Sequence, residues 1–287
     1  MEIVPRLNQK IRYPWAIEIY PYLRDHHIEG KVILPAVEVL TVLAKVVKIN
    51  FPPINISCLH KARFSRFLSI LPDTRRLEVF VDMETADDGI IASLLTSLRS
   101  KDGTISRTVE HTRVEFAAAD SAPSFVPPFR VVNKLKGDCI SVPSATIYRE
   151  LVPFGTAYQN IVGDLSVSPK GALAYLSGGG NEADDDLLGS PFPLDAAMHA
   201  ACVWGQRFGG IVPFPTGFEK RIIYQKTKKG GAYLGRVVPV NVNHESLIFD
   251  GWIYDLDGIM YESINGIQMR DVSQGRLRPP DWIKADL

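Results

Sequence analysis

Residues 24–36 read "RDHHIEGKVILPA" and place two adjacent histidines, His26 and His27, ahead of a glycine and a proline. An imidazole side chain gains and loses its proton near neutral pH, so either histidine could act as a general acid or base. Neighbouring residues of an extended segment point to opposite faces, and therefore only one of the two can face a given cavity. Gly30 lets the backbone approach a ligand closely, and Pro35 sets the start of the apolar helix that follows. From these residues alone, a catalytic role and a structural, hydrogen-bonded role are both possible for either histidine.

A second group suited to acid–base chemistry lies in "PFPLDAAMHAACVW", where Asp195 and His199 are four residues apart. In a helix this spacing puts both side chains on one face, so His199 could hydrogen-bond the carboxyl group of Asp195 and orient it. The apolar neighbours of Asp195 favour the neutral acid, whereas the start of a helix favours the carboxylate. An aspartate that only stabilises the helix start is the alternative, and the sequence leaves both open.

The other histidines and the cysteines lack the spacings of a metal site. No His-Glu-x-x-His or Cys-x-x-Cys pair occurs, so we expect no metal ion and no disulfide framework. His60, His111 and His244 are expected to be solvated side chains. The glycine-rich run 178–186 is expected to be a flexible loop, because no Gly-Lys-Ser/Thr follows it. The basic run 220–229 is either a solvated hairpin or a docking patch for an acidic carrier protein.

The composition is that of a globular protein with a sizeable core, since 46% of the 287 residues are hydrophobic and 22% are charged. The 32 basic residues balance 32 acidic residues, so no overall field attracts the protein to nucleic acid or to an anionic membrane. The N-terminus lacks a basic segment followed by an apolar run, and no stretch approaches the roughly 18 apolar residues of a membrane span. The reducing cytoplasm is therefore the expected location.

Hydrophobic patterning predicts the same plan in both halves of the chain. Residues 34–49 have the apolar spacing of a helix, and the β-rich segments that follow are separated by the hairpin signals at 88–89 and 102–103. Further along, a second apolar helix is expected to open at Pro193, and more β-rich segments lead to a last hairpin at 257–258. The helix and the final hairpin keep nearly the same spacing in both halves, which indicates a diverged internal repeat.

We therefore predict an α+β double hotdog, in which two antiparallel sheets each wrap around a long central helix. The first half comprises residues 1–118 and the second half residues 141–287. Residues 119–140, which begin in a stretch rich in Ala, Pro and Ser, form the linker between them. The two sheets are free to join edge to edge.

The first histidine segment also fits a longer motif. In "HHIEGKVILP" the pattern His-x-x-x-Gly-x-x-x-x-Pro is met by His26, Gly30 and Pro35, whereas a start at His27 breaks the spacing. The motif thus selects His26 over its neighbour.

Two further motifs follow in order along the chain. The segment "FGTAYQ" is similar to Tyr-Gly-Pro-x-Phe-Gln and keeps Gly155 and Gln159. The segment "SPFPLDAAMHA" is similar to His-Pro-x-Leu-Leu-Asp-x-x-x-Gln/His and supplies Asp195 and His199. Together with the closing strands "DLDGIMYESINGIQMR", these motifs resemble the dehydratase domains of polyketide synthases, which are related to those of fatty acid synthases. The resemblance extends from about Ile11 to Arg270.

Several positions depart from the family pattern. They lie around the motifs rather than at the His and Asp themselves, and comprise Ala36, Phe154, Thr156, Tyr158 and Ser190. The departures therefore concern the shape of the substrate more than the type of reaction.

The resemblance implies removal of water from a 3-hydroxyacyl thioester to give a trans-2-enoyl thioester. His26 would take the proton from C2, Asp195 would donate a proton to the departing hydroxyl group, and His199 would position Asp195. The backbone amide of Gly30 would donate to the thioester oxygen, and Pro35 would hold that loop in place. The remaining substrate-binding residues implied are Gly155, Tyr158 and Gln159.

The resemblance further implies an acyl carrier protein, whose phosphopantetheine arm holds the substrate, as partner. No other cofactor is expected. Ketosynthase and ketoreductase enzymes of the same synthase are expected partners, a homodimer is compatible, and neither nucleic acid nor a membrane is expected.

Three alternatives stay open. An isomerase or a cyclase on the same scaffold could use the same base, and a non-catalytic module could hold an acyl chain or a carrier for another enzyme. A hotdog thioesterase is less favoured, because hydrolysis has no evident use for a His and an Asp contributed by separate halves.

Overall fold

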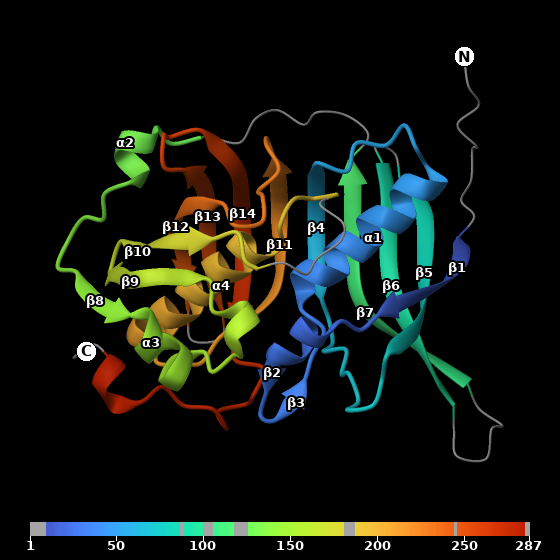
Figure 1. The fold of residues 1–287 in the computed structure, drawn as a ribbon, viewed down its shortest axis with the longest axis horizontal. Helices are drawn as coiled ribbons and strands as arrows, with labels where there is room; N and C mark the ends of the chain where they lie inside the picture. The colour runs from blue at the N-terminus through green and yellow to red at the C-terminus, as the bar shows by residue number, and fades with distance from the viewer. Residues whose placement is uncertain are drawn as a thin grey trace.

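The computed structural model describes residues 10–86, 89–99, 106–117, 126–180, 187–243 and 246–284. These residues form a 12-stranded antiparallel sheet, a separate two-stranded hairpin and two long helices that lie on one face of the sheet (Figure 1). The helices are α1 (Ala36–Asn50), α2 (Phe129–Val132), α3 (Ser144–Thr146) and α4 (Phe192–Trp204). Shorter helical turns are η1 (Pro21–Asp25), η2 (Ile147–Leu151), η3 (Thr156–Tyr158), η4 (Gly205–Gly209) and η5 (Asp281–Ile283).

The strands of the first half are β1 (Ile11–Glu18), β2 (His27–Ile28), β3 (Lys31–Val32), β4 (Cys58–Phe64), β5 (Arg76–Ala86), β6 (Gly89–Arg99) and β7 (Ser106–Ala117). Those of the second half are β8 (Ile140–Pro143), β9 (Ile161–Ser168), β10 (Gly171–Ser177), β11 (Phe214–Ile223), β12 (Ala232–Val242), β13 (Leu247–Asp255) and β14 (Met260–Arg270).

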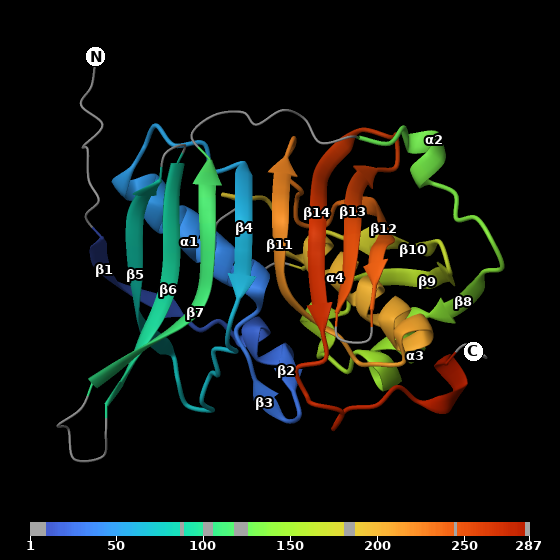
Figure 2. The same ribbon diagram turned by 180° about the vertical axis from the view of Figure 1, so that it is seen from behind.

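The sheet has the same topology on both sides of a central seam, where β4 pairs with β11 (Figure 2). Outward from the seam the order is β7, β6, β5 and β1 in the first half, and β14, β13, β12 and β10 in the second. Together with its seam strand, β4 or β11, each set contains one strand that precedes the central helix and four that follow it, so the structure repeats as the sequence spacing predicts. Strands β9 and β8 extend the second half. The domain boundaries at residues 118 and 140 stay predictions, because residues 118–125 lie outside the described ranges.

Helix α1 begins where the sequence predicts, directly after Pro35, whose carbonyl oxygen accepts hydrogen bonds from the amides of Glu38 and Val39 at 3.1 Å. Helix α4 starts at Phe192, and Pro193 stands in its first turn, where a missing amide hydrogen costs nothing. Every residue of α4 is buried, because strands β9 and β10 lie in front of it in Figure 1 and β13 and β14 lie behind it.

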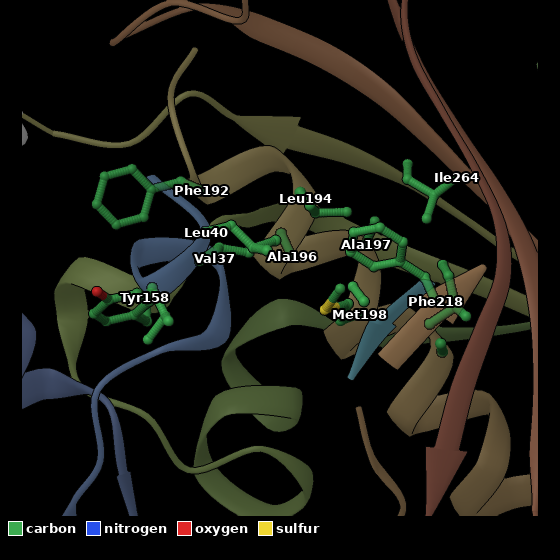
Figure 3. Close-up of a cluster of buried hydrophobic side chains, with 14 of the residues drawn as sticks. Val37, Leu40, Tyr158, Phe192, Leu194, Ala196, Ala197, Met198, Phe218 and Ile264 are labelled. Carbon is green, nitrogen blue, oxygen red and sulfur yellow. The ribbon is translucent and has the colours of Figure 1, made fainter. Parts of the chain in front are cut away.

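The two helices share one hydrophobic core. Figure 3 shows Val37 and Leu40 of α1 next to Ala196 of α4, with Phe218 of β11 nearby. This contact between α1 and α4 lies close to the first turn of both helices. Residues at the two helix starts can therefore approach one another although they are far apart in the sequence.

The hairpin β2–β3 turns through Glu29 and Gly30, whose φ angles are 49° and 74°. Two consecutive residues with positive φ match the twist of a two-residue hairpin. The predicted turn at 257–258 lies between β13 and β14, with Gly258 at φ 90°. The turns at 88–89 and 102–103 fall wholly or partly outside the described residues, as do His244 and residues 181–186.

Two findings bear on the function classes. None of the helices in the described ranges is long and apolar enough to cross a membrane. Within the same ranges, no three His, Cys, Asp or Glu side chains form a group that could hold a metal ion.

Candidate active site

His26 lies between η1 and β2 and is tied to Ile33 by two hydrogen bonds. Its Nδ1 is 2.9 Å from the carbonyl oxygen of Ile33, and the amide of Ile33 donates to the carbonyl oxygen of His26 at 3.0 Å. A carbonyl oxygen only accepts hydrogen bonds, so Nδ1 carries the proton of the neutral ring. The lone pair of the neutral imidazole therefore resides on Nε2.

Aromatic rings surround the imidazole of His26. The ring centroids of Phe154 and Tyr158 lie 4.3 Å and 5.2 Å from that of His26. Burial lowers the pKa of His26 from its ordinary value of 6.5, although the charge of Asp195 and the bond to Ile33 act in the opposite direction. His26 is therefore neutral at pH 7 and able to accept a proton.

Asp195 and His199 lie one turn apart near the start of α4, and both are buried. Oδ2 of Asp195 is 2.9 Å from Nε2 of His199, but their relative orientation makes no hydrogen bond, and neither atom has another partner among the described residues. The hydroxyl group of Tyr148 lies 3.4 Å from Nδ1 of His199 and accepts a hydrogen bond from the amide of Ile161 at 2.8 Å. Buried polar atoms are rarely left without a hydrogen-bond partner. Oδ2 of Asp195 and Nε2 of His199 are therefore atoms to which a ligand could form hydrogen bonds.

His26, Asp195 and His199 line one cavity of about 90 Å³. The first comes from the first half of the chain and the other two from the second half, so the cavity lies between the halves. Most of the remaining lining is apolar and includes Ile33, Leu34, Val39, Phe154 and Met198. Arg66 and Phe67 line the cavity and are themselves exposed, which marks the end that opens to solvent.

The two other residues of the first motif support the loop and lie outside the cavity lining. Pro35 is buried at the start of α1. Gly30 is exposed in the β2–β3 turn, with open space around its α-carbon. The expected role of the Gly30 amide toward a thioester oxygen stays a prediction, and its position at the hairpin tip does not bring it to the cavity wall.

The residues of the second motif, expected to bind substrate, lie behind the cavity wall. Gly155 packs against Asp25, Gln159 is exposed and donates from Nε2 to the carbonyl oxygen of Phe154 at 2.8 Å, and Tyr158 is fully buried. None of the three lines the cavity, because this loop turns its backbone toward η1 and presents only Phe154 to the cavity. The three residues thus shape the wall without forming it.

His27 lies next to the site without entering it. Its ring is 6.5 Å from that of Phe154, and it is not part of the cavity lining. The spacing that selects His26 is thus matched by the geometry, which directs the neighbouring histidine elsewhere.

Phe154 and Cys202 also line the cavity. Phe154, the first residue of "FGTAYQ" and one of the departures from the family pattern, stands between His26 and His199, with its ring 5.1 Å from that of His199. Cys202 was not expected from the sequence. Cys202 lies two residues short of the end of α4, and burial raises the pKa of its thiol to about 12, so it is not a nucleophile near neutral pH. Only its helical spacing from Asp195 could have indicated it.

His111 corrects an expectation. It is buried rather than solvated and lines the cavity, with Nε2 2.8 Å from Oγ1 of Thr96 and Nδ1 3.2 Å from the carbonyl oxygen of Arg66. Burial lowers its pKa. The charged neighbours of His111 in the sequence suggested exposure, but strand alternation turns this side chain inward.

Comparisons with known proteins agree with this architecture. Residues 136–279 match the family model described as the polyketide synthase dehydratase N-terminal domain. No curated protein matches the chain.

Solved structures show the same fold at low sequence identity. The dehydratase domain from the CurJ module of curacin polyketide synthase has 15% identity and a TM-score of 0.72, with 93% of each chain covered. A trans-AT polyketide synthase dehydratase domain from Brevibacillus brevis has 18% identity and a TM-score of 0.71, covering 92% of this chain and 94% of that one. An isomerase-inactive variant of GphF DH1 has 14% identity and a TM-score of 0.67, with 96% of each chain covered.

These similarities confirm the predicted double-hotdog fold. Since the matched segment from residue 136 to residue 279 is half of the 287 residues, the chain belongs to the polyketide synthase dehydratase family.

Proposed function

We propose that this protein removes water from a 3-hydroxyacyl thioester and releases the trans-2-enoyl thioester. The observation that carries the proposal is the shared cavity, in which His26 holds a lone pair on Nε2 and Asp195 holds a buried Oδ2 without a hydrogen-bond partner among the described residues. A base and an acid on one small, mostly apolar cavity are what dehydration requires.

In the proposed reaction, removal of the proton from C2 accompanies loss of the hydroxyl group from C3. Nε2 of His26 takes the proton from C2, the electrons of the broken C–H bond form the C2–C3 double bond, and the bond from C3 to the hydroxyl oxygen breaks. Protonated Asp195 gives its proton to the departing hydroxyl group, which leaves as water. Transfer of the proton from His26 to the Asp195 carboxylate then restores both groups.

His199 is proposed to keep the carboxyl group of Asp195 in position, with Tyr148 behind it. The apolar lining strengthens interactions between the charges that develop during proton transfer, because little water is present to screen them. The chemistry uses these side chains alone.

The substrate is proposed to be carried on the phosphopantetheine arm of an acyl carrier protein. The exposed end of the cavity at Arg66 and Phe67 supports this, because it offers an entrance for an extended arm and a cation that can pair with a phosphate group. Ketosynthase and ketoreductase partners follow from the chemistry, since one forms and the other reduces the 3-oxoacyl group that precedes a 3-hydroxyacyl thioester.

His26 and the neighbouring His27 are expected to differ in their contribution to catalysis. His26→Phe and Asp195→Ala should each lower kcat for dehydration of a 3-hydroxyacyl thioester by a factor of about 10²–10⁴, because each loses a proton-transfer group. His27→Ala should lower it by less than about threefold, since His27 does not line the cavity. Enoyl product followed by mass spectrometry provides the measurement, and circular dichroism checks the fold. An active His26→Phe variant would show that another group acts as the base.

A double-bond isomerase is the second candidate, and the observation that favours it is Phe154. This ring stands between His26 and His199 and lacks the hydroxyl group of the family's usual Tyr. Without that hydroxyl group, the cavity could hold an enoyl substrate while His26 moves a proton between C2 and C4. Incubation of the trans-2-enoyl thioester in D₂O tests this, because isomerisation introduces deuterium along the chain, whereas a cyclase or a binding module gives a ring or no turnover.

A further inference from the structure

A buried carboxyl group lies close to the candidate site without entering it. Glu38 is in the first turn of α1, and only 9% of its surface is exposed. It does not line the cavity of His26 and Asp195, but a separate cavity of about 280 Å³ that includes Trp15, Tyr22 and Lys45. A glutamate this deeply buried is rare unless polar partners hold it.

The partners of Glu38 connect it to His26. Oε1 of Glu38 accepts a hydrogen bond from the hydroxyl group of Tyr22 at 3.2 Å and another from that of Tyr158 at 3.5 Å. Tyr158 also contacts the catalytic candidate, because its ring lies edge-on to that of His26, with centroids 5.2 Å apart. Glu38 therefore holds the ring that packs directly behind His26.

The same two tyrosines reach the start of α4. The ring of Phe192 lies 5.4 Å from that of Tyr158 and 6.1 Å from that of Tyr22. Figure 3 shows Tyr158 and Phe192 beside the start of α1. Glu38 is thus at the centre of an aromatic cluster that joins the helix starts of both halves.

The charge of Glu38 is coupled to that of Asp195. Burial raises the pKa of Glu38 to about 7, the hydrogen bonds from the two tyrosines lower it, and the charge of Asp195 raises it. The titratable groups around Glu38 are Tyr22 of η1, Tyr158 of η3 and Asp195 of α4, with Glu18 of β1 and Lys45 of α1 along the second cavity.

We propose that Glu38 is a positioning residue, which holds Tyr158 behind His26 through the hydrogen bond between its Oε1 and the hydroxyl group of Tyr158. The expected effect on kcat rests on the proposed dehydration, whereas the positioning of Tyr158 rests on the contacts alone. Glu38 would act through its neighbours, since it does not line the cavity that His26 and Asp195 share.

Two substitutions of Glu38 separate the loss of its charge from the loss of its hydrogen bonds. Glu38→Gln keeps an acceptor oxygen for both tyrosines and removes the charge, whereas Glu38→Met removes both at similar volume. For Glu38→Gln we expect kcat at the pH optimum within about threefold of the unmodified protein. For Glu38→Met we expect a loss of kcat of roughly tenfold or more, because the hydrogen bonds that hold the two tyrosines are gone.

The matched control is Glu18→Gln, which makes the same charge change on the wall of the second cavity at an exposed position. Its kcat should not change. If Glu38→Gln loses as much kcat as Glu38→Met, or if Glu38→Met keeps full kcat, the proposal is overturned.

A measurement without turnover keeps this proposal distinct from the proposed reaction. In infrared spectra, a carbonyl band of a buried protonated carboxylic acid should disappear with a midpoint near pH 7 and be absent from Glu38→Gln. If this band titrates as expected while no thioester is dehydrated, the proposed dehydration is wrong, but the assignment of Glu38 as a buried carboxyl group is retained. If Glu38→Met does not fold, Tyr158→Phe removes the hydrogen bond between Tyr158 and Glu38 and should lower kcat in the same way, whereas full kcat in Tyr158→Phe would overturn the proposal.

Discussion

At the scale of single residues, the environment of His26 determines its protonation. The bond from Nδ1 to the carbonyl oxygen of Ile33 fixes the tautomer, and the rings of Phe154 and Tyr158 pack against the imidazole. His27, one residue further, lies at a longer centroid distance of 6.5 Å from the ring of Phe154 and is not a cavity residue. Adjacent side chains of identical chemistry thus differ in their ring packing and in their access to the cavity.

The pH dependence of activity follows from this burial. A base must be neutral, and burial lowers the pKa of His26 below 6.5, so activity should be retained as the pH falls to 6.5 and be lost only below it. The acid limb of kcat/KM, measured with a 3-hydroxyacyl thioester, should therefore have its midpoint below pH 6.5. Phe154→Ala should admit water and move this midpoint upward, toward the ordinary value. A midpoint above 6.5 in the unmodified protein would contradict the assignment of His26 as the base.

At the scale of elements, one loop of the second half fastens the histidine segment of the first. The carbonyl oxygen of Asp25 accepts a hydrogen bond from the amide of Gly155 at 2.7 Å, and Oδ2 of Asp25 accepts one from the amide of Ala157 at 2.9 Å. The motif glycine is needed for this close approach, since a β-carbon at residue 155 would lie 2.5 Å from Cγ of Asp25. The contact sets the position of η1 and, with it, that of His26.

Gly155→Ala should therefore disturb the site. The added methyl group must displace the Asp25 side chain, which should lower the free energy of unfolding by about 1–3 kcal/mol and kcat/KM by roughly tenfold or more. Urea denaturation and the dehydration assay measure the two effects. Gly180→Ala is the matched control, because a β-carbon there meets nothing within 4 Å and should change neither quantity. Equal results for the two variants would show that the contact does not position His26.

At the scale of the whole molecule, the two halves are joined by the β4–β11 seam into one sheet, and the cavity lies between them. A buried ion pair lies at this seam. Nε of Arg221 on β11 donates to Oε2 of Glu262 on β14 at 2.8 Å, and both side chains are at most 2% exposed. Arg221 was expected to belong to an exposed basic run, but this ion pair turns it into the core.

Removing either partner should leave an unpaired charge in the core. Arg221→Met and Glu262→Met should each lower the free energy of unfolding by about 3–5 kcal/mol, and the double variant by less than their sum. The control is Glu219→Gln, which breaks the exposed pair between Arg63 of β4 and Glu219 of β11 at the same seam and should cost less than about 1 kcal/mol. Urea denaturation of all four variants measures this. Additive losses would mean that the two buried groups do not interact.

The sequence by itself determined the features that depend on local spacing. The start of α1 after Pro35, the turn at 257–258, the repeat of helix and strands, and the selection of His26 over His27 all follow from residue types a few positions apart. Proline geometry, hairpin turns and hydrophobic periodicity act over such distances, which is why they can be predicted without coordinates.

Only the tertiary structure decided which side chains meet. It brought His26 and Asp195 to one cavity from separate halves, buried His111, and turned Tyr158 toward Glu38 rather than into the cavity. These outcomes depend on how the two helices and the curved sheet pack against each other, because the contacts join residues far apart in the chain. Burial then changed the chemistry of the groups, as the lowered pKa of His26 and the raised pKa of Glu38 illustrate.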